Sequence, residues 1–259
     1  MDDLELALRL ADHADGLAME RFRATDLIVE TKPDLTPVTE ADRAVEQAMR
    51  AVLAAERPED SVLGEEYGTQ GASPRRWILD PIDGTKNYVR GVPVWAVLIA
   101  LLDGDDVRMG VVSAPALGRR WWAERGRGAF CTDAPGSEPR RLHVSAVAQL
   151  SDASFSYSDD RGWGDRGAST GLSVLLAQTW RQRAYGDFWS HMMVAEGAVD
   201  IAAEPQLESY DMAALIPIVE EAGGRVTAYD GRAALSGGCA LSTNGLLHDA
   251  VVGILSPRG

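Results

Sequence analysis

The sequence predicts an α+β fold, in which layers of helices pack against layers of strands. Two segments near the start, residues 3–24 and 38–52, repeat apolar side chains at the spacing of an amphipathic helix. Short apolar runs separated by turn residues then predict an antiparallel meander that continues to about residue 145. From residue 146 onward, strand-like and helical segments alternate, which is typical of α/β layering.

We therefore expect two halves within one compact unit, an N-terminal α+β half (1–145) and a C-terminal α/β half (146–259). A chain of 259 residues is long enough to bury a full core in this way. Its apolar fraction of 46% and charged fraction of 25% are ordinary for a globular protein.

Within the first half, characteristic residues mark the ends of the expected elements. Two prolines predict a loop at residues 32–37, between the two helices. Thr39 and Asp42 have the spacing of a capping pair at the start of the second helix. Short strands are expected to end at residue 63 and to include residues 77–79.

The meander that follows has three expected strands. Residues 94–102 and 107–112 are joined by an Asp-Gly-Asp-Asp turn, which is typical of a hairpin. Residues 120–123 add a third strand, and the glycines at 126 and 128 turn the chain away from it.

The second half has its clearest helix at residues 211–222. Gly223 and Gly224 follow this helix as a stop signal, and Pro217 is expected to kink it. The other expected helices are 168–178, 188–197 and 246–254, and the expected strands are 153–157, 180–185, 199–202, 225–227 and 239–243.

The composition excludes several classes of function. A net charge of −14 argues against a nucleic-acid-binding surface. The two cysteines and four histidines have neither disulfide nor zinc spacing, so reduced thiols in a cytoplasmic protein are the simplest account. The acidic N-terminus and the absence of any run of 18 apolar residues predict neither a signal peptide nor a membrane span.

Residues 77–87 carry the strongest chemical signal. An apolar strand runs directly into Asp80 and Asp83, and buried carboxylates are costly unless they are paired or bind a cation. Gly84 and Thr85 follow at once and can offer backbone N–H groups to an anion. A cation site beside an anion site predicts a metal-assisted enzyme that acts on phosphates.

Glu65 lies just past another strand end and can join the two aspartates. A set of carboxylates without cysteine or histidine selects a hard cation such as Mg²⁺. The alternative is that Asp80 and Asp83, which precede Pro81 and Gly84, are ordinary turn residues.

The chain resembles the inositol monophosphatase superfamily over nearly its whole length, in the blocks V-T-E-A-D, L-G-E-E, D-P-I-D-G-T-K-N and Y-D-M-A-A-L-I-P-I-V-E-E-A-G-G. Three stretches look most like the histidinol-phosphate phosphatases of actinobacteria, namely T-K-P-D-L-T-P-V-T-E-A-D-R-A-V-E, N-Y-V-R-G-V-P-V-W-A and R-A-Y-G-D-F-W. The resemblance implies a layered αβαβα sugar-phosphatase fold, a phosphomonoesterase that uses two or three Mg²⁺ ions, and a homodimer.

The resemblance assigns the metal ligands by position. They would be Glu65, Asp80, the carbonyl of Ile82, Asp83 and Asp211. The approach of Asp211 to the other acids rests on the resemblance, and its alternative role is that of a simple helix N-cap. Lys32 and Glu66 are weaker candidates for a supporting role behind these ligands.

The resemblance also implies a catalytic set that consists of Asp42, Thr85, Glu65 and Asp83. Thr85 and Asp42 would together position and deprotonate a metal-bound water, while the N–H groups of Gly84 and Thr85 hold phosphate oxygens. For Asp42 the alternative is a helix-capping role alone.

Substrate choice is expected to depend on the second half. Relatives directed at inositol usually carry a small Ser/Thr-Ala pair after the residue at Gly186, whereas this chain has Asp187 and Phe188. Histidinol phosphate carries a cationic amine, for which Asp187 and Glu204 are apt partners, although either can be an ordinary surface acid. The expected substrate-binding residues are Gly84, Thr85, Arg183, Gly186, Asp187, Glu204 and Asp211.

These expectations add up to a cytoplasmic phosphatase that converts L-histidinol phosphate into L-histidinol and phosphate in histidine biosynthesis. The nearest alternative substrate is inositol-1-phosphate or a related sugar phosphate, hydrolysed by the same chemistry. An alternative of another class is a catalytically silent protein that binds a phosphorylated ligand and regulates a partner. The complete set of acids speaks against this last reading.

Overall fold

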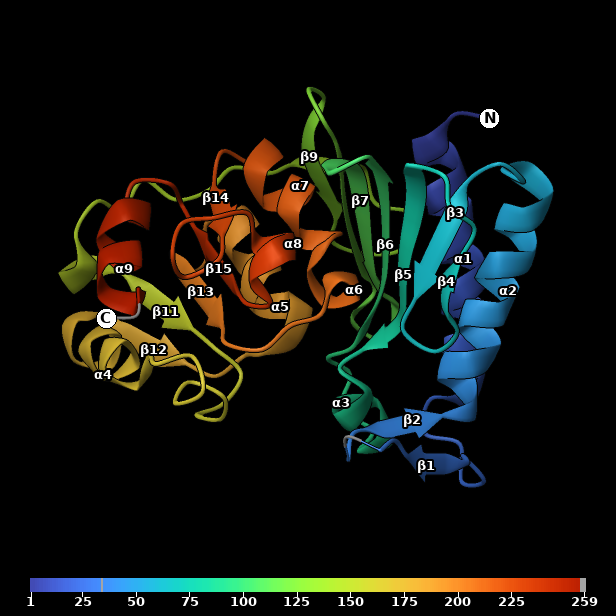
Figure 1. Ribbon diagram of the computed structural model, residues 1–259, viewed down its shortest axis with the longest axis horizontal. Helices are drawn as coiled ribbons and strands as arrows, with labels where there is room; N and C mark the ends of the chain where they lie inside the picture. Colours follow the sequence, from blue (N-terminus) through green and yellow to red (C-terminus); the bar gives the residue numbers. More distant parts are fainter. Residues whose placement is uncertain (34, 257–259) are drawn as a thin grey trace.

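The computed structural model describes residues 1–33 and 35–256 and shows alternating layers of helices and strands (Figure 1). An outer helix pair covers a large sheet, central helices separate this sheet from a smaller one, and a second helix pair covers the far side. This arrangement confirms the predicted α+β fold with its αβαβα layers. In the described part of the chain, every helix is too short or too polar to cross a membrane.

The first layer is the helix pair α1 (Asp3–Arg21) and α2 (Glu40–Glu56). Their apolar stripes are buried against the large sheet in one core that includes Trp77. Thr39 and Asp42 form the predicted capping pair of α2, because each side chain accepts the backbone N–H of the other residue.

A short ribbon leads into α2. It consists of β1 (Val29–Thr31) and β2 (Pro37–Thr39), which pair antiparallel. The loop predicted at residues 32–37 is therefore one residue too long, because Pro37 already begins β2. Asp34, in the same loop, lies outside the described residues.

The large sheet has, within the described residues, eight strands in the order β10-β9-β8-β7-β6-β5-β3-β4. Neighbouring strands run antiparallel except β3 and β5, which run parallel. The strands are β3 (Ser61–Gly64), β4 (Gly68–Gln70), β5 (Arg75–Asp83), β6 (Ala96–Asp103), β7 (Asp106–Ala114), β8 (Arg119–Glu124), β9 (Gly128–Thr132) and β10 (Arg140–Arg141). The predicted meander is confirmed in β6, β7 and β8, and it continues to residue 141 through β9 and β10, which were not predicted as separate strands. The chain does not turn away from the sheet at Gly126 and Gly128, because Gly128 begins β9, which pairs with β8.

A bulge near the end of β5 determines where its acids point. Asp80 pairs with Leu98 and Asp83 with Ala96, so the register between β5 and β6 shifts by one residue here. Pro81 lies at the shift, and its missing N–H cannot contribute to the ladder. Because a bulge redirects side chains, both carboxylates leave the sheet at the same end of the strand.

The central layer corrects the prediction of one kinked helix at residues 211–222. The helices near this layer are α5 (Asp187–Ala195), α6 (Ser209–Met212) and α7 (Leu215–Glu221). The predicted helix is divided at residues 213–214, so the kink expected at Pro217 is wrong. Pro217 is the third residue of α7, in the first turn, where a backbone N–H has no partner within the helix.

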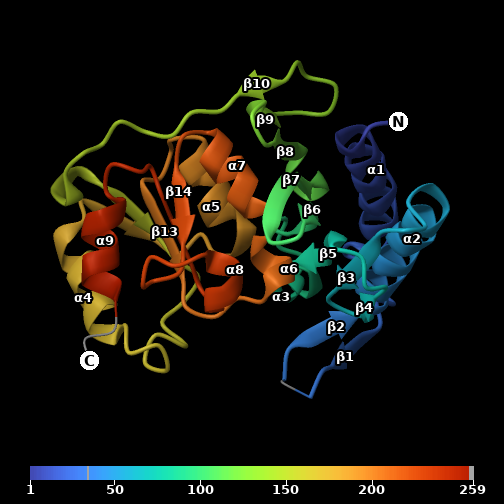
Figure 2. The ribbon, with the colours of Figure 1, turned by 45° about the horizontal axis from the view of Figure 1, so that its top comes forward.

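The smaller sheet has five strands among the described residues, in the order β12-β11-β13-β15-β14. They are β11 (Ser154–Ser156), β12 (Arg181–Arg183), β13 (Ile201–Glu204), β14 (Arg225–Thr227) and β15 (Ala240–Thr243), all at predicted positions. The predicted helices α4 (Ser169–Gln178) and α9 (His248–Leu255) cover its outer face, and a short helix, α8 (Ala234–Gly237), was missed. The chain reaches this half from β10 through an extended segment (Figure 2).

Candidate active site

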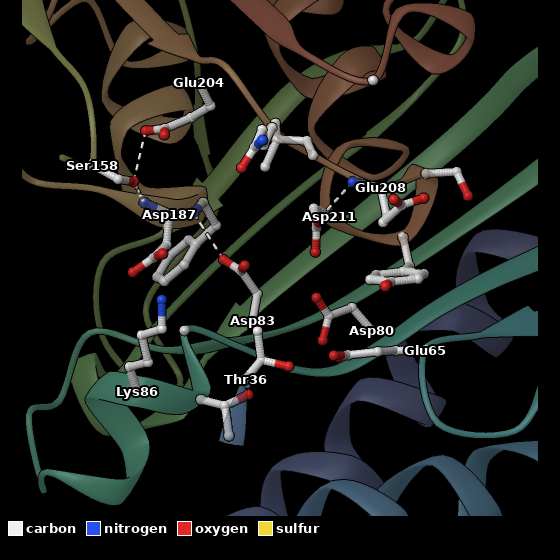
Figure 3. Close-up of a pocket in the computed structure, with 18 of the residues that line it drawn as sticks. Thr36, Glu65, Asp80, Asp83, Lys86, Ser158, Asp187, Glu204, Glu208 and Asp211 are labelled. Atoms are coloured by element: carbon white, nitrogen blue, oxygen red, sulfur yellow. Dashed lines mark hydrogen bonds between the residues drawn. The ribbon is translucent and has the colours of Figure 1, made fainter. Parts of the chain in front are cut away.

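A polar cavity of about 1180 Å³ lies between the large sheet and the smaller one. Its walls come from the end of β5, from α3 (Thr85–Val89), from the start of α5, and from the segment that joins β13 to α6. Figure 3 shows acidic side chains from both halves of the chain pointing into this space. Segments more than 100 residues apart in the sequence therefore meet at the bulged end of β5.

Asp80, Asp83 and Asp211 form an acidic cluster in the cavity. Each offers one carboxylate oxygen, and these three oxygens lie within 4.8 Å of one another. Each side chain also accepts a backbone N–H at 2.7–3.0 Å, from Ile82, Phe188 and Glu208 respectively. The backbone thus fixes the direction of each carboxylate, and Asp211 caps α6 at the same time as it joins the cluster.

The cluster is too negative to be stable in its fully ionised form without a cation. Burial raises the pKa of Asp80 well above its usual range, and the charges of Glu65 and Asp83 raise it further. Burial and the charge of Asp187 have the same effect on the pKa of Asp83. Burial raises the pKa of Asp211 to about 7, although the N–H of Glu208 opposes this rise. Carboxylate oxygens in this arrangement fit a hard divalent cation, which would neutralise the repulsion.

Glu65 follows β3 and lies beside Asp80, at the edge of the cluster (Figure 3). Lys32 donates hydrogen bonds of 2.6 Å to Glu65 and to Glu66. These bonds raise the pKa of Lys32, although burial opposes the charged form. Glu66 also donates its backbone N–H to the buried Glu46, so Glu66 is held behind the cavity wall. Lys32 therefore neutralises the acids at this edge of the site.

Thr85 connects the cluster to Asp42, which lies behind it. The Thr85 hydroxyl lies 2.9 Å from the carbonyl oxygen of Ile82 and 3.3 Å from Oδ1 of Asp42. Asp42 is fully buried, and its other oxygen accepts hydrogen bonds from Thr39. Burial raises the pKa of Asp42 to about 6, which the Thr39 bonds limit. Asp42 is therefore both a helix cap and a buried acceptor for the Thr85 hydroxyl.

Gly84 makes the turn between β5 and α3. Its backbone has φ +82°, in the left-handed region that favours glycine. A Cβ atom at this position would lie 3.1 Å from the carbonyl oxygen of Val94. Any larger residue at position 84 would therefore crowd Val94. The turn that glycine allows places Gly84 and Thr85 in the cavity wall beside the acidic cluster.

A second pair of acids, Asp187 and Glu204, lines the same cavity, with Asp187 beside Asp83 and Glu204 farther from the cluster (Figure 3). The Ser158 hydroxyl donates to Glu204 at 2.7 Å and accepts the backbone N–H of Asp187 at 3.0 Å. The side-chain amide of Asn87 donates to Asp187 at 3.1 Å. Burial raises the pKa of Glu204 to about 8, although the bond from Ser158 opposes it. Burial also raises the pKa of Asp187, against the charge of Lys86.

The whole arrangement is that of a known phosphatase family, whose sequence pattern matches residues 2–257. The chain belongs to the inositol monophosphatase family. Members of this family are metal-dependent phosphatases that act on small phosphate esters, and the acidic cluster agrees with that chemistry.

Within the inositol monophosphatase family, the chain is similar to two proteins named histidinol-phosphatase. The one from Streptomyces coelicolor is 57% identical and aligns with 100% of this chain and 98% of its own length. The one from Mycobacterium tuberculosis is 60% identical, over 97% of this chain and 96% of its own length. The solved inositol monophosphatase of Thermotoga maritima has a TM-score of 0.86 at 32% identity, covering 98% of this chain and 97% of the other. These matches identify the chain as a phosphatase. The residues that line the cavity bear on which phosphate ester it accepts.

Two of the predicted substrate-binding residues lie away from the cavity of this phosphatase. Arg183 is exposed on β12, and its guanidinium bonds to the neighbouring carbonyl of Gln182 at 2.7 Å. Gly186 precedes α5 and donates its N–H to Ser190, so its place is behind the wall rather than in it. Neither belongs to the described residues that line the cavity.

The sequence analysis missed three polar residues at this end of the site: Ser158, Lys86 and Asn87. Ser158 follows a predicted strand, but nothing in its surrounding sequence marked it as different from other serines. Lys86 and Asn87 lie inside the strongest motif, and their position directly after Thr85 was a usable signal.

Proposed function

We propose that this phosphatase hydrolyses L-histidinol phosphate to L-histidinol and phosphate, in the cytoplasm, as a step of histidine biosynthesis. The observation that carries the proposal is the second pair of acids in the cavity, the half-buried Asp187 beside Asp83 and the buried Glu204 farther from the cluster. A substrate with a phosphate at one end and an ammonium group at the other complements both ends. Inositol-1-phosphate has hydroxyl groups in place of the ammonium, so it would offer no positive charge to Glu204, whose surroundings are Ser158 and other acids.

The proposed metal is Mg²⁺, as two or three ions, held by Glu65, Asp80, the carbonyl oxygen of Ile82, Asp83 and Asp211. Once bound, Mg²⁺ would lower the pKa of a water molecule and neutralise charge on the phosphate. The bonds that fix these oxygens, from backbone N–H groups and from Lys32, pre-organise the set.

Asp42 and Thr85 would handle the proton of the attacking water. The Thr85 hydroxyl would accept this proton while its own proton passes to Oδ1 of Asp42, 3.3 Å away. The raised pKa of Asp42, about 6, suits a base that works near neutral pH. The backbone N–H groups of Gly84 and Thr85 would hold the phosphate oxygens.

The high identity with two proteins named histidinol-phosphatase supports this substrate. The resemblance to a family of homodimers supports a homodimer, which gel filtration with light scattering would test. 

A comparison of substrates tests the proposal directly. The purified protein, with Mg²⁺, is given L-histidinol phosphate or inositol-1-phosphate, and kcat/KM is measured from phosphate release. We expect histidinol phosphate to be preferred by at least about 100-fold, because two carboxylates recognise its amine. Faster hydrolysis of inositol-1-phosphate would overturn the substrate assignment. No release of phosphate from a panel of phosphomonoesters would instead favour a silent phospholigand-binding protein.

A further inference from the structure

Ser158 occupies a position between the two acids that the proposed function assigns to the substrate amine. Its hydroxyl group donates to Oε1 of Glu204 at 2.7 Å and accepts the backbone N–H of Asp187 at 3.0 Å (Figure 3). The hydroxyl therefore uses its proton and one lone pair in two defined directions. Movement of Glu204 or of the Asp187 backbone would break one of these two bonds.

The next backbone N–H along the chain reaches the acidic cluster. Phe188 donates its N–H to Oδ2 of Asp83 at 2.8 Å, across 105 residues of sequence. Asp187 has φ +49°, in the left-handed region, which asparagine and aspartate tolerate better than most residues. This conformation lets two successive N–H groups point to two different partners, Ser158 and Asp83.

The bonds form one continuous path from Glu204 through Ser158 and the turn at 187–188 to Asp83. Burial makes the path stiff, because Phe188 is 1% exposed and Glu204 is 5% exposed. Asn87 adds a further bond from α3 to the side chain of Asp187, so the turn is held from three sides. A shift at the amine end of the cavity would therefore be transmitted to the direction of the Asp83 carboxylate.

We propose that Ser158 is a positioning residue that couples recognition of the substrate amine to the placement of Asp83. The proposal rests on the proposed function, in which Asp187 and Glu204 bind the amine and Asp83 binds Mg²⁺. Ser158 touches neither the phosphate nor the metal in this role. Its contribution is to let binding energy at the amine increase turnover at the phosphate, in addition to tightening substrate binding.

The test compares Ser158→Ala with Ser158→Thr, which keeps the hydroxyl group. The control is Ser61→Ala at the start of β3, which removes a buried hydroxyl group that donates to the backbone carbonyl of Ser73 at 2.8 Å and makes no bond on this path. Each variant is given L-histidinol phosphate and the amine-free ester phenyl phosphate, and kcat and KM are measured separately. Thermal unfolding against Mg²⁺ concentration, without substrate, reports metal binding independently of activity.

We expect Ser158→Ala to lower kcat/KM for histidinol phosphate about tenfold, with part of the loss in kcat, because a buried carboxylate loses its donor. Phenyl phosphate turnover should change less than about twofold, and Ser158→Thr should restore most of the loss. The Mg²⁺ concentration that gives half of the thermal shift should rise about threefold in Ser158→Ala and stay unchanged in Ser61→Ala.

Three results would count against the coupling. An equal loss for both esters would make Ser158 a residue of general structure, and unchanged kinetics would remove it from the site. A loss confined to KM with an unchanged Mg²⁺ response would overturn the link to Asp83. The proposed function fails separately, if the unaltered protein shows no preference for histidinol phosphate over inositol-1-phosphate, and the coupling then fails with it.

Discussion

The two ends of the cavity hold acids in different ways. At the metal end, Asp80, Asp83 and Asp211 are oriented by backbone N–H groups and repel one another. At the amine end, Asp187 and Glu204 are held mainly by neutral side chains, Asn87 and Ser158. At both ends burial raises the pKa values, that of Asp211 to about 7 and that of Glu204 to about 8. In the proposed function the cation that favours the ionised acids differs, because a metal ion supplies it at one end and the amine of the substrate at the other.

In the proposed function, the two ends have different roles. The acidic cluster takes part in the hydrolysis of the phosphate ester, and Asp187 and Glu204 select the substrate. The metal end is built on the rigid end of a sheet strand and would serve any phosphate ester that fits. Asp187 begins a helix and Glu204 ends a strand of the other sheet, and in the proposed function these two side chains determine which ester is accepted. Variants at the two ends should therefore change the kinetics in different ways. Three predictions, ordered from the largest expected change in kcat or KM to the smallest, test this, and a fourth concerns stability.

The largest effect is expected for Asp83→Asn. We expect kcat to fall at least about 1000-fold for every ester. The neutral amide of asparagine cannot replace the charged carboxylate as a ligand of the metal ion that would activate the water. The fold should stay intact, and the variant without metal should unfold at a higher temperature than the unaltered protein, because one repulsive charge is gone. Asp105→Asn, in the exposed hairpin turn, is the control. Near-normal turnover would remove Asp83 from the site.

A smaller loss is expected for Thr85→Val, which keeps the shape of the side chain and removes the hydroxyl group. We expect kcat to fall about 100-fold for both substrates, since the contact between the attacking water and Asp42 is broken. Thr85→Ser should recover most of the activity. If Thr85→Val lowered turnover of histidinol phosphate alone, Thr85 would belong to the amine end instead.

At the amine end, Asp187→Asn should raise KM for histidinol phosphate about tenfold or more and leave phenyl phosphate nearly unchanged. Asparagine is the suitable replacement because the residue has φ +49°, where alanine would add backbone strain. Asp160→Asn, on the exposed part of the neighbouring loop, controls for the loss of one negative charge. An equal change for both esters would assign Asp187 to general structure.

The last prediction concerns stability and pH rather than turnover. Burial raises the pKa of Glu204 from 4.5 to about 8, so the folded protein holds a proton that the unfolded chain releases between these values. Stability therefore falls as pH rises through this window. Glu204→Gln should make the fall smaller, and the raised pKa values of Asp42 and Asp211 account for part of what remains. The variant should match the unaltered protein at pH 4–5 and exceed it above pH 8, by at most about 4–5 kcal/mol.

Urea unfolding at pH 5 and pH 9, without metal, measures this difference. Glu59→Gln, at an exposed position, is the control. If the Glu204→Gln variant gained no stability at pH 9, burial would not raise the pKa of Glu204 in the folded protein.

Much of the fold could be predicted because its signals are local. The capping pair at Thr39 and Asp42, the hairpin turn after β6 and the glycines after α7 were each read from neighbouring residues. The predictions failed where packing decided the outcome. The division of α6 from α7 has no local signal, and the ribbon of β1 and β2 is too short to show a pattern. The boundary at residue 145 and the roles of the site residues stay predictions.

The sequence by itself determined one wall of the acidic cluster, the stretch from Asp80 to Thr85. Asp80, Pro81, Asp83, Gly84 and Thr85 are consecutive or nearly so, and the missing N–H of Pro81 and the left-handed turn at Gly84 are properties of those residues alone.

Only the tertiary structure decided what faces this motif. The N–H of Phe188 bonds to Asp83 across 105 residues, and the Ser158 hydroxyl bonds to Glu204 across 46. Such approaches depend on how α5 packs between the two sheets, which no local run of residues specifies. One short stretch of sequence therefore supplies two of the three clustered acids, and the packing of the layers brings Asp211, Asp187 and Glu204 to them.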